Sequence, residues 1–231
     1  PTTMTSFRTL TLGTAMAAAA LLPMAGSADA KAYKVGLIAS LSGPTASLGQ
    51  QIERGARLYE QLHKNDLGDD TVELVVRDDT GPAPDVAKRL AQELVVRDHV
   101  DFLAGIIFTP NANAIAPIAT QAKVPFVIMN AATTGIMPRV PNAARMSFTM
   151  SQVTAPLGTW AARNGSKRAF TIVADYAPGL DAEKSFARTF TDGGGEVVEN
   201  LRVPLANVEF SPYVRRIRDA RPTAVNLAWG A

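Results

Sequence analysis

Several residue types or patterns are missing from this chain of 231 residues, and each absence removes a class of function. There is no cysteine, which excludes disulfides, thiolate metal sites and thiol catalysis together, although a zero count does not reveal the redox compartment. Lys and Arg number 23 against 21 Asp and Glu, and no basic run is interleaved with aromatic residues. A nucleic-acid binder needs such a phosphate-neutralising stripe, so we expect no DNA or RNA partner.

What is present indicates a folded, water-soluble protein. Hydrophobic residues make up 47% of the chain and charged residues 19%, with 15 Pro and 17 Gly. This balance excludes intrinsic disorder and a collagen-like repeat.

Residues 1–30 have the layout of a cleaved secretory signal. A short segment carrying Arg8 precedes the apolar stretch Leu10–Leu22, and small residues then lead to Ala28-Asp29-Ala30. A membrane anchor is the alternative, but polar residues and a proline interrupt the stretch, and a span needs about 20 apolar residues. We expect cleavage after Ala30, which leaves a mature chain from Lys31 that is exported and not stably inserted in a membrane.

Beyond the signal, short apolar runs alternate with amphipathic stretches. Most runs are nearly continuous, which is typical of strands covered by helices on both faces, and the amphipathic stretches place apolar residues three or four apart. The repeated strand-helix-strand order predicts an α/β fold with mostly parallel sheets. The expected strands are Val35–Ile38, Val72–Val76, Phe102–Ala104, Val124–Met129, Phe170–Ala174, Val197–Val203 and Val225–Ala228. The expected helices lie near Ile52–Leu62, Val86–Leu94, Ala112–Ala122, Thr154–Asn164, Leu180–Thr191 and Phe210–Asp219.

The alternation of expected strands and helices is interrupted between Asn130 and Gln152, where Gly135, Pro138 and Pro141 suppress regular structure. We interpret this stretch as the passage between two α/β lobes, residues 31–150 and residues 151–231. The sequence stops just after an expected core strand with no helix to cover it, so we expect the second lobe to be incomplete.

Five segments in this order carry a resemblance to a known family. They are Val35–Gly49 (VGLIASLSGPTASLG), Val75–Asp79 (VVRDD), Ala116–Pro125, Asn130–Thr133 (NAAT) and Val203–Tyr213. Together they resemble the periplasmic solute-binding proteins of ABC importers, in the branched-chain amino-acid class.

This resemblance implies the type I periplasmic-binding-protein fold, in which two lobes hold a ligand between them. It implies a periplasmic monomer without a cofactor or metal that delivers a carboxylate-bearing solute to the permease of an ABC transporter. Branched-chain or other amino acids, amides and aromatic acids all stay open as ligands. In the family the chain returns to the first lobe after completing the second, so a C-terminal part is expected beyond Ala231.

The first candidate site follows the expected strand at Phe102–Ala104, because ligands of parallel sheets gather beyond the carboxyl ends of strands. Thr109 is predicted as the N-cap of a helix and Pro110 as its first residue, which leaves free backbone amides for an anion such as a carboxylate. An ordinary cap that binds nothing is the alternative. The resemblance assigns Thr109 a hydroxyl contact with the ligand carboxylate.

A second group of candidates follows other strands. Ala131, Ala132 and Thr133 have small side chains that let backbone groups approach a solute, and a threonine hydroxyl can donate or accept. The resemblance implies that Ala131 and Thr133 bind the ligand's polar head; a plain turn is the alternative. Ser42 belongs to the turn after the first strand, with a purely structural role as the alternative. Tyr176 is predicted to close over the ligand, or else to pack on the surface.

Other chemistry is set aside. Asp79-Thr80-Gly81 spells the aspartic-protease triplet, but that chemistry needs two carboxylates and the sequence has no second triplet. His63 and His99 read as solvated surface residues. Phosphate-loop, dinucleotide and nucleophile-elbow motifs are missing, so we expect no catalytic residue. A hydrolase on a similar scaffold, or the ligand-sensing domain of a receptor, remains the alternative function.

Overall fold

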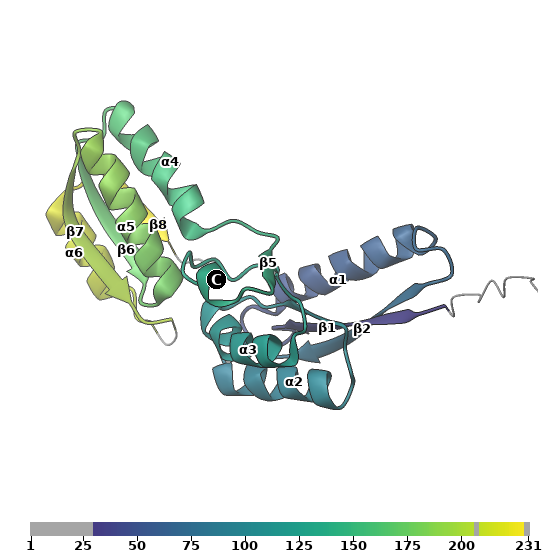
Figure 1. Ribbon diagram of the computed structural model, residues 1–231. Helices are drawn as coiled ribbons and strands as arrows, with labels where there is room; N and C mark the ends of the chain where they lie inside the picture. The colour runs from purple at the N-terminus through teal and green to yellow at the C-terminus, as the bar shows by residue number, and fades with distance from the viewer. Residues whose placement is uncertain (1–29, 206–207, 229–231) are drawn as a thin grey trace, which may run out of the picture. The chain divides into compact units, whose positions relative to one another are not determined.

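The computed structural model describes residues 30–205 and 208–228, which form two parallel sheets flanked by helices (Figure 1). The expected signal, residues 1–30, lies outside the described residues except for Ala30. The expected α/β class with parallel strands is confirmed.

The first sheet has five strands in the order β2-β1-β3-β4-β5, all parallel. Its core lies against helices α2 and α3, where Phe126 and Ile128 are buried with Leu94 and Ile115. Helix α1 lies on the opposite side of β1 and β2 from these two helices (Figure 1). The elements are β1 (Ala32–Ala39), α1 (Ala46–His63), β2 (Thr71–Asp78), α2 (Pro84–Val96), β3 (Phe102–Gly105), α3 (Thr109–Ala122), β4 (Phe126–Ile128) and β5 (Ala143–Arg145).

The second sheet has three parallel strands in the order β7-β6-β8. On one side Phe186 and Phe190 of α5 pack with alanines of α4, and on the other Phe170 and Leu201 pack against α6 residues that include Ile217. The elements are α4 (Met150–Arg163), β6 (Arg168–Ala174), α5 (Ala177–Asp192), β7 (Glu196–Val203), α6 (Ser211–Ala220) and β8 (Ala224–Ala228).

Six of the seven apolar runs expected to be strands lie wholly within strands, while the run Val124–Met129 extends beyond both ends of β4. The interpretation of the stretch between Asn130 and Gln152 as irregular was wrong. It contains the 3-10 helix η1 (Met137–Arg139) and strand β5, which pairs with β4. The β5 sequence Ala-Ala-Arg has no β-branched or alternating pattern. Its position depends instead on tertiary contacts, because the Asn142 side chain donates to the carbonyls of Ala119 and Val124 just before the strand.

Helix α4 begins four residues earlier than the expected start near Thr154. Thr149 and Gln152 form a capping box, in which the Thr149 hydroxyl accepts from the Gln152 amide and the Gln152 side chain accepts from the Thr149 amide. The spacing of these two residues is a helix-start signal that reading apolar periodicity alone overlooks.

In each sheet a glycine lets the helix that follows the first strand close onto the end of that strand. A Cβ on Gly49 of α1 would lie 2.0 Å from the Ser40 carbonyl oxygen, and one on Gly179 of α5 would lie 1.9 Å from that of Ala174. No side chain fits at these distances. The helix N-termini therefore sit directly over the carboxyl ends of β1 and β6.

The two glycines of α1 give a matched test of this packing. Gly49→Ala is expected to lower the free energy of unfolding by about 1–3 kcal/mol or more, since its Cβ meets backbone that cannot move aside. Gly55→Ala, with nothing within 4 Å of the added carbon, is expected to raise it by about 0.5–1 kcal/mol through helix propensity. Urea denaturation of both variants measures the difference, and equal effects would contradict it.

Candidate ligand-binding site

The loops that follow β3 and β4 are held side by side at the carboxyl edge of the first sheet. The Met129 amide donates to the Gly105 carbonyl at 2.8 Å, and the Ala131 amide donates to that of Ile106 at 3.1 Å. Strand pairing thus continues past the strand ends. Ile106 has φ of +67°, which is strained for a β-branched residue, and such strain concentrates at functional sites.

Thr109 does not cap α3, so that prediction was wrong. Phe108 has the extended backbone of the N-cap, Thr109 is the first helical residue and Pro110 the second. The Thr109 hydroxyl is buried and has no hydrogen-bond partner among the described residues. A buried unpaired hydroxyl is costly, so this group is suited to bond a bound solute.

Asp79 holds the start of α3 against the first two strands. Its fully buried carboxylate accepts from the Ser40 hydroxyl at 2.6 Å and from the Asn111 amide group at 2.7 Å. The Asn111 amide group also donates to the Gly81 carbonyl at 2.8 Å. These contacts explain the protease-like triplet as a structural support for the Thr109 region.

Ser42 is exposed and is engaged in the turn after β1. Its hydroxyl and amide bond the Asp78 carboxylate, as do the amides of Leu41 and Thr80. Burial alone would raise the pKa of Asp78, but these hydrogen bonds outweigh burial and lower it below its ordinary value. The contacts favour the structural alternative for Ser42, and its ligand role stays a prediction.

Ala131, Ala132 and Thr133 follow β4 and are all buried. The Thr133 hydroxyl donates to Oδ2 of Asp181 at 2.8 Å, and the Thr134 amide donates to the same oxygen at 2.8 Å. Asp181 belongs to the first turns of α5. A carboxylate therefore already accepts a hydrogen bond from the threonine that the resemblance assigned to the ligand's polar head.

Arg145, at the end of β5, adds a cation to this group. Its Nη2 donates to the Thr133 carbonyl at 2.5 Å, while Nε and Nη1 are buried without a partner in the described part of the chain. Burial lowers the pKa of Arg145, and the nearby Asp181 carboxylate opposes that shift. Sequence reasoning missed both Arg145 and Asp181, because neither lies in a motif.

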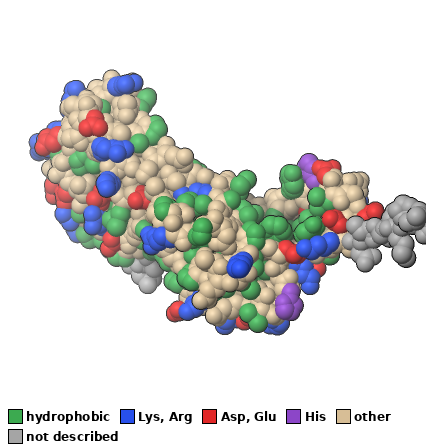
Figure 2. Space-filling view, in the orientation of Figure 1, with side chains coloured by type: hydrophobic (Ala, Val, Ile, Leu, Met, Phe, Trp, Pro, Cys, Tyr) green, Lys and Arg blue, Asp and Glu red, His purple; other side chains and the backbone are tan. Residues whose placement is uncertain are grey.

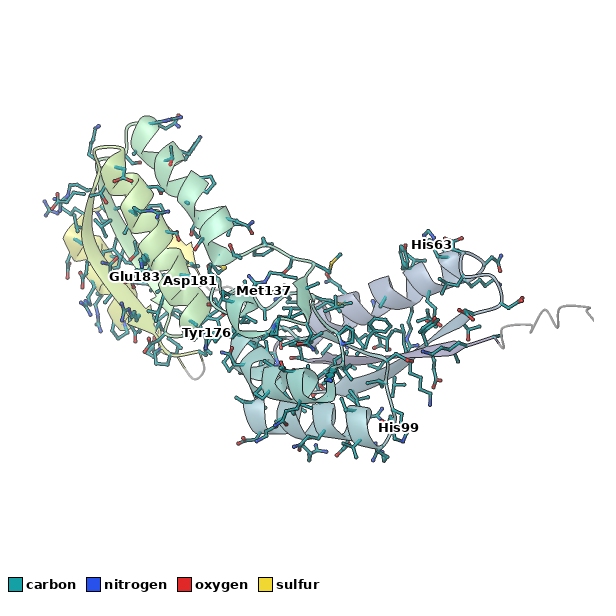
Figure 3. All side chains as sticks on the ribbon, viewed as in Figure 1. His63, His99, Met137, Tyr176, Asp181 and Glu183 are labelled. Carbon is teal, nitrogen blue, oxygen red and sulfur yellow. The ribbon has the colours of Figure 1, made fainter. Side chains whose placement is uncertain are left out.

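Tyr176 is the N-cap residue of α5 and lies at that helix's start, on the same helix end as Asp181 (Figure 3). Its hydroxyl is buried and unpaired among the described residues, and burial raises its pKa well above the ordinary value. The phenol is therefore neutral at physiological pH and able to donate to a ligand. Among the described residues no hydrogen bond joins it to Thr109 or Thr133, so its role in the site stays a prediction.

A groove of about 870 Å³ lies elsewhere, between α1 and the face of the first sheet that α2 and α3 leave open. Its lining includes Tyr59, Leu67, Val127, Met129 and Met146, and none of the six predicted ligand residues. Figure 2 shows hydrophobic side chains gathered along α1. The groove is therefore separate from the candidate site.

The histidines stand apart from this site as well. His63 stacks on Tyr59 near the end of α1 and contacts Asp66, and His99 follows α2 (Figure 3). Among residues 30–205 and 208–228, no group of three His, Asp or Glu side chains is placed to hold a metal ion. No helix in those ranges is both long and apolar enough to cross a membrane.

Comparisons with known proteins agree with the geometry of the sheets. Residues 32–231 match the family model described as "Periplasmic binding protein". The chain is 47% identical over 207 residues to Leu/Ile/Val-binding protein homolog 6 of Brucella abortus (strain 2308), covering 89% of this chain and 53% of that protein. The chain thus spans about half the length of the curated relatives it matches.

Two solved structures are similar in both sequence and fold. One is a solute binding protein of an ABC transporter from Rhodopseudomonas palustris BisB5 in complex with 3,4-dihydroxy benzoic acid: identity 46%, TM-score 0.81, covering 85% of this chain and 54% of that one. The other is an R. palustris solute binding protein in complex with 4-hydroxybenzoate: identity 44%, TM-score 0.83, covering 85% and 53%.

The hydrogen bonds on Asp78 predict a pH dependence of stability. Because folding lowers its pKa from 3.8, the contribution is present above about pH 4 and is lost as the pH falls through the folded-state value. Asp78→Asn is expected to cost about 1 kcal/mol at pH 7 and little at pH 2.5. Urea denaturation at the two pH values measures this, with the exposed Asp69→Asn as control; equal losses at both would count against it.

Proposed function

Because the chain belongs to the periplasmic binding protein family, we propose that it captures a small carboxylate-bearing solute in the periplasm and delivers it to the permease of an ABC transporter. Residues 31–150 and 151–231 are the two proposed lobes, after removal of a signal at residues 1–30. The protein acts as a monomer and needs no cofactor.

One observation carries this proposal: the loop after β4 already binds a carboxylate. Thr133 and Thr134 together donate two hydrogen bonds of 2.8 Å to one carboxylate oxygen. Arg145 brings two further donors that are unpaired among the described residues. Hydroxyl and amide donors meet at this oxygen, and the Arg145 guanidinium, bonded to the Thr133 carbonyl, adds positive charge beside them, which favours an anion because charge-assisted bonds are the stronger kind.

The first ligand to test is a hydroxylated aromatic acid. Two relatives of 44–46% identity were solved with hydroxybenzoates, whereas the curated relatives are named for leucine, isoleucine and valine. Both ligand classes share the carboxylate. The buried phenol of Tyr176 supports the aromatic acid, since it offers a hydrogen bond to a ring hydroxyl.

The proposed mechanism is capture without turnover. The first lobe fixes the carboxylate and the second swings over it, so that the permease meets the closed form. The competing function is a hydrolase on a similar scaffold. The two differ in a simple observable, because a hydrolase releases a product and a binding protein returns its ligand unchanged.

Calorimetry on the full-length protein tests the ligand. We expect 4-hydroxybenzoate to bind with a micromolar or tighter Kd and to be recovered intact, while L-leucine binds at least about tenfold more weakly. Tighter binding of L-leucine would assign the protein to the amino-acid binders, and product formation would favour the hydrolase.

A second prediction concerns Thr133. Thr133→Ala is expected to weaken 4-hydroxybenzoate binding by about 1–3 kcal/mol, because the carboxylate loses a hydroxyl donor. Thr191→Ala is the matched control, since that exposed hydroxyl donates only to the Ala187 carbonyl of its own helix. Unchanged affinity in Thr133→Ala would remove Thr133 from the site.

A further inference from the structure

We propose that Asp181 is an internal competitor for the ligand carboxylate, one that occupies the receptor when no solute is bound and must leave before a solute enters. This inference rests on the proposed function. It adds a residue that sets both affinity and ligand choice.

The geometry of Asp181 matches what a bound carboxylate needs. Its Oδ2 accepts from the Thr133 hydroxyl and from the Thr134 amide, each at 2.8 Å. Two donors converging on one oxygen are the usual environment of a bound carboxylate group. A solute carboxylate cannot use these donors while Asp181 holds them.

Arg145 gives a solute the means to displace Asp181. Among the described residues the Arg145 side chain bonds the Thr133 carbonyl and not Asp181, and its Nε and Nη1 donors stay buried and unpaired. A free carboxylate is not tied to a helix backbone and can approach the guanidinium as well as Thr133. It therefore gains bonds that Asp181 does not make, and this surplus drives the exchange.

The exchange also links binding to α5. Asp181 joins α5 to the loop after β4, and a chain of serine hydroxyls runs beside it: Ser185 donates to Ser151 at 2.8 Å, and Ser151 lies 3.3 Å from the Thr134 hydroxyl. Displacing Asp181 breaks the charged contact between α5 and the loop and leaves the contacts between the Ser185, Ser151 and Thr134 hydroxyls in place. A ligand thereby changes the attachment of α5 by changing one contact.

The exchange predicts discrimination between ligand classes. A displaced Asp181 near the site repels a second negative charge, so a solute with one carboxylate is favoured over one with two. If Asp181 instead served as the ammonium partner of an amino acid, its removal would weaken L-leucine binding. Asp181→Ala therefore separates the two roles: tighter binding of a carboxylate supports the competitor role, and weaker binding of L-leucine supports the ammonium partner.

The test is Asp181→Ala in the full-length protein, titrated with 4-hydroxybenzoate by calorimetry. The association constant is expected to rise by about tenfold or more over that of the wild type, because two charge-assisted hydrogen bonds no longer need to be displaced. Asp192→Ala, which removes the same charge from the exposed end of the same helix, is the control and should change affinity less than twofold.

Amide hydrogen exchange at Thr134 gives a second readout that does not depend on affinity. Its amide is expected to be protected in the wild type, to lose protection in Asp181→Ala, and to regain it in that variant with saturating 4-hydroxybenzoate. In Asp181→Asn, which keeps an acceptor but not the charge, the protection of the Thr134 amide should lie between that of the wild type and that of Asp181→Ala.

The outcomes distinguish a failure of this inference from a failure of the proposed function. Wild-type binding with equal or weaker binding by Asp181→Ala overturns the competitor role and leaves the proposed function standing. Loss of L-leucine binding in Asp181→Ala assigns the residue to an ammonium group and also overturns it. A wild type and variant that bind neither probe remove the proposed function and this inference together.

Discussion

The candidate site depends on the pairing of two loops beyond the ends of β3 and β4. The bonds from Met129 to Gly105 and from Ala131 to Ile106 keep the two chains in register after the strands have ended. Gly105 is required here, because a Cβ would lie 2.2 Å from the Ile38 carbonyl oxygen. With this pairing in place, Thr109 begins its helix at the same edge from which Thr133 extends, so both hydroxyls come from one rigid platform.

The hydrogen-bond donors of the candidate site are either paired with a protein carboxylate or buried. Asp79 fixes the approach to Thr109, Asp181 bonds Thr133, and Arg145 stays partly buried beside them. Such an arrangement is prepared for negative charge before any ligand arrives, and the exchange of Asp181 for a solute carboxylate is the reorganisation that binding requires. The family relationship and this geometry independently support the binding of a carboxylate-bearing solute.

The sequence allowed the fold to be predicted better than the site. Continuous apolar runs such as Phe170–Ala174 mark buried parallel strands without knowledge of their neighbours. Strand β5 has no such run and is positioned by Asn142, so only tertiary structure reveals it. The N-cap of α3 was misplaced by one residue, since the choice of Phe108 depends on backbone angles that composition does not encode. Asp181 lies 48 positions from Thr133, and no local pattern links residues that far apart.

The groove along α1 has a practical consequence for work on this stretch of chain. Parallel sheets are ordinarily covered on both faces, yet Tyr59, Leu67 and Met146 are 66%, 48% and 74% exposed around an open face. Such a surface attracts other apolar surfaces as concentration rises. Residues 31–231 expressed alone are therefore expected to self-associate through this face, so their apparent size in solution would rise with protein concentration.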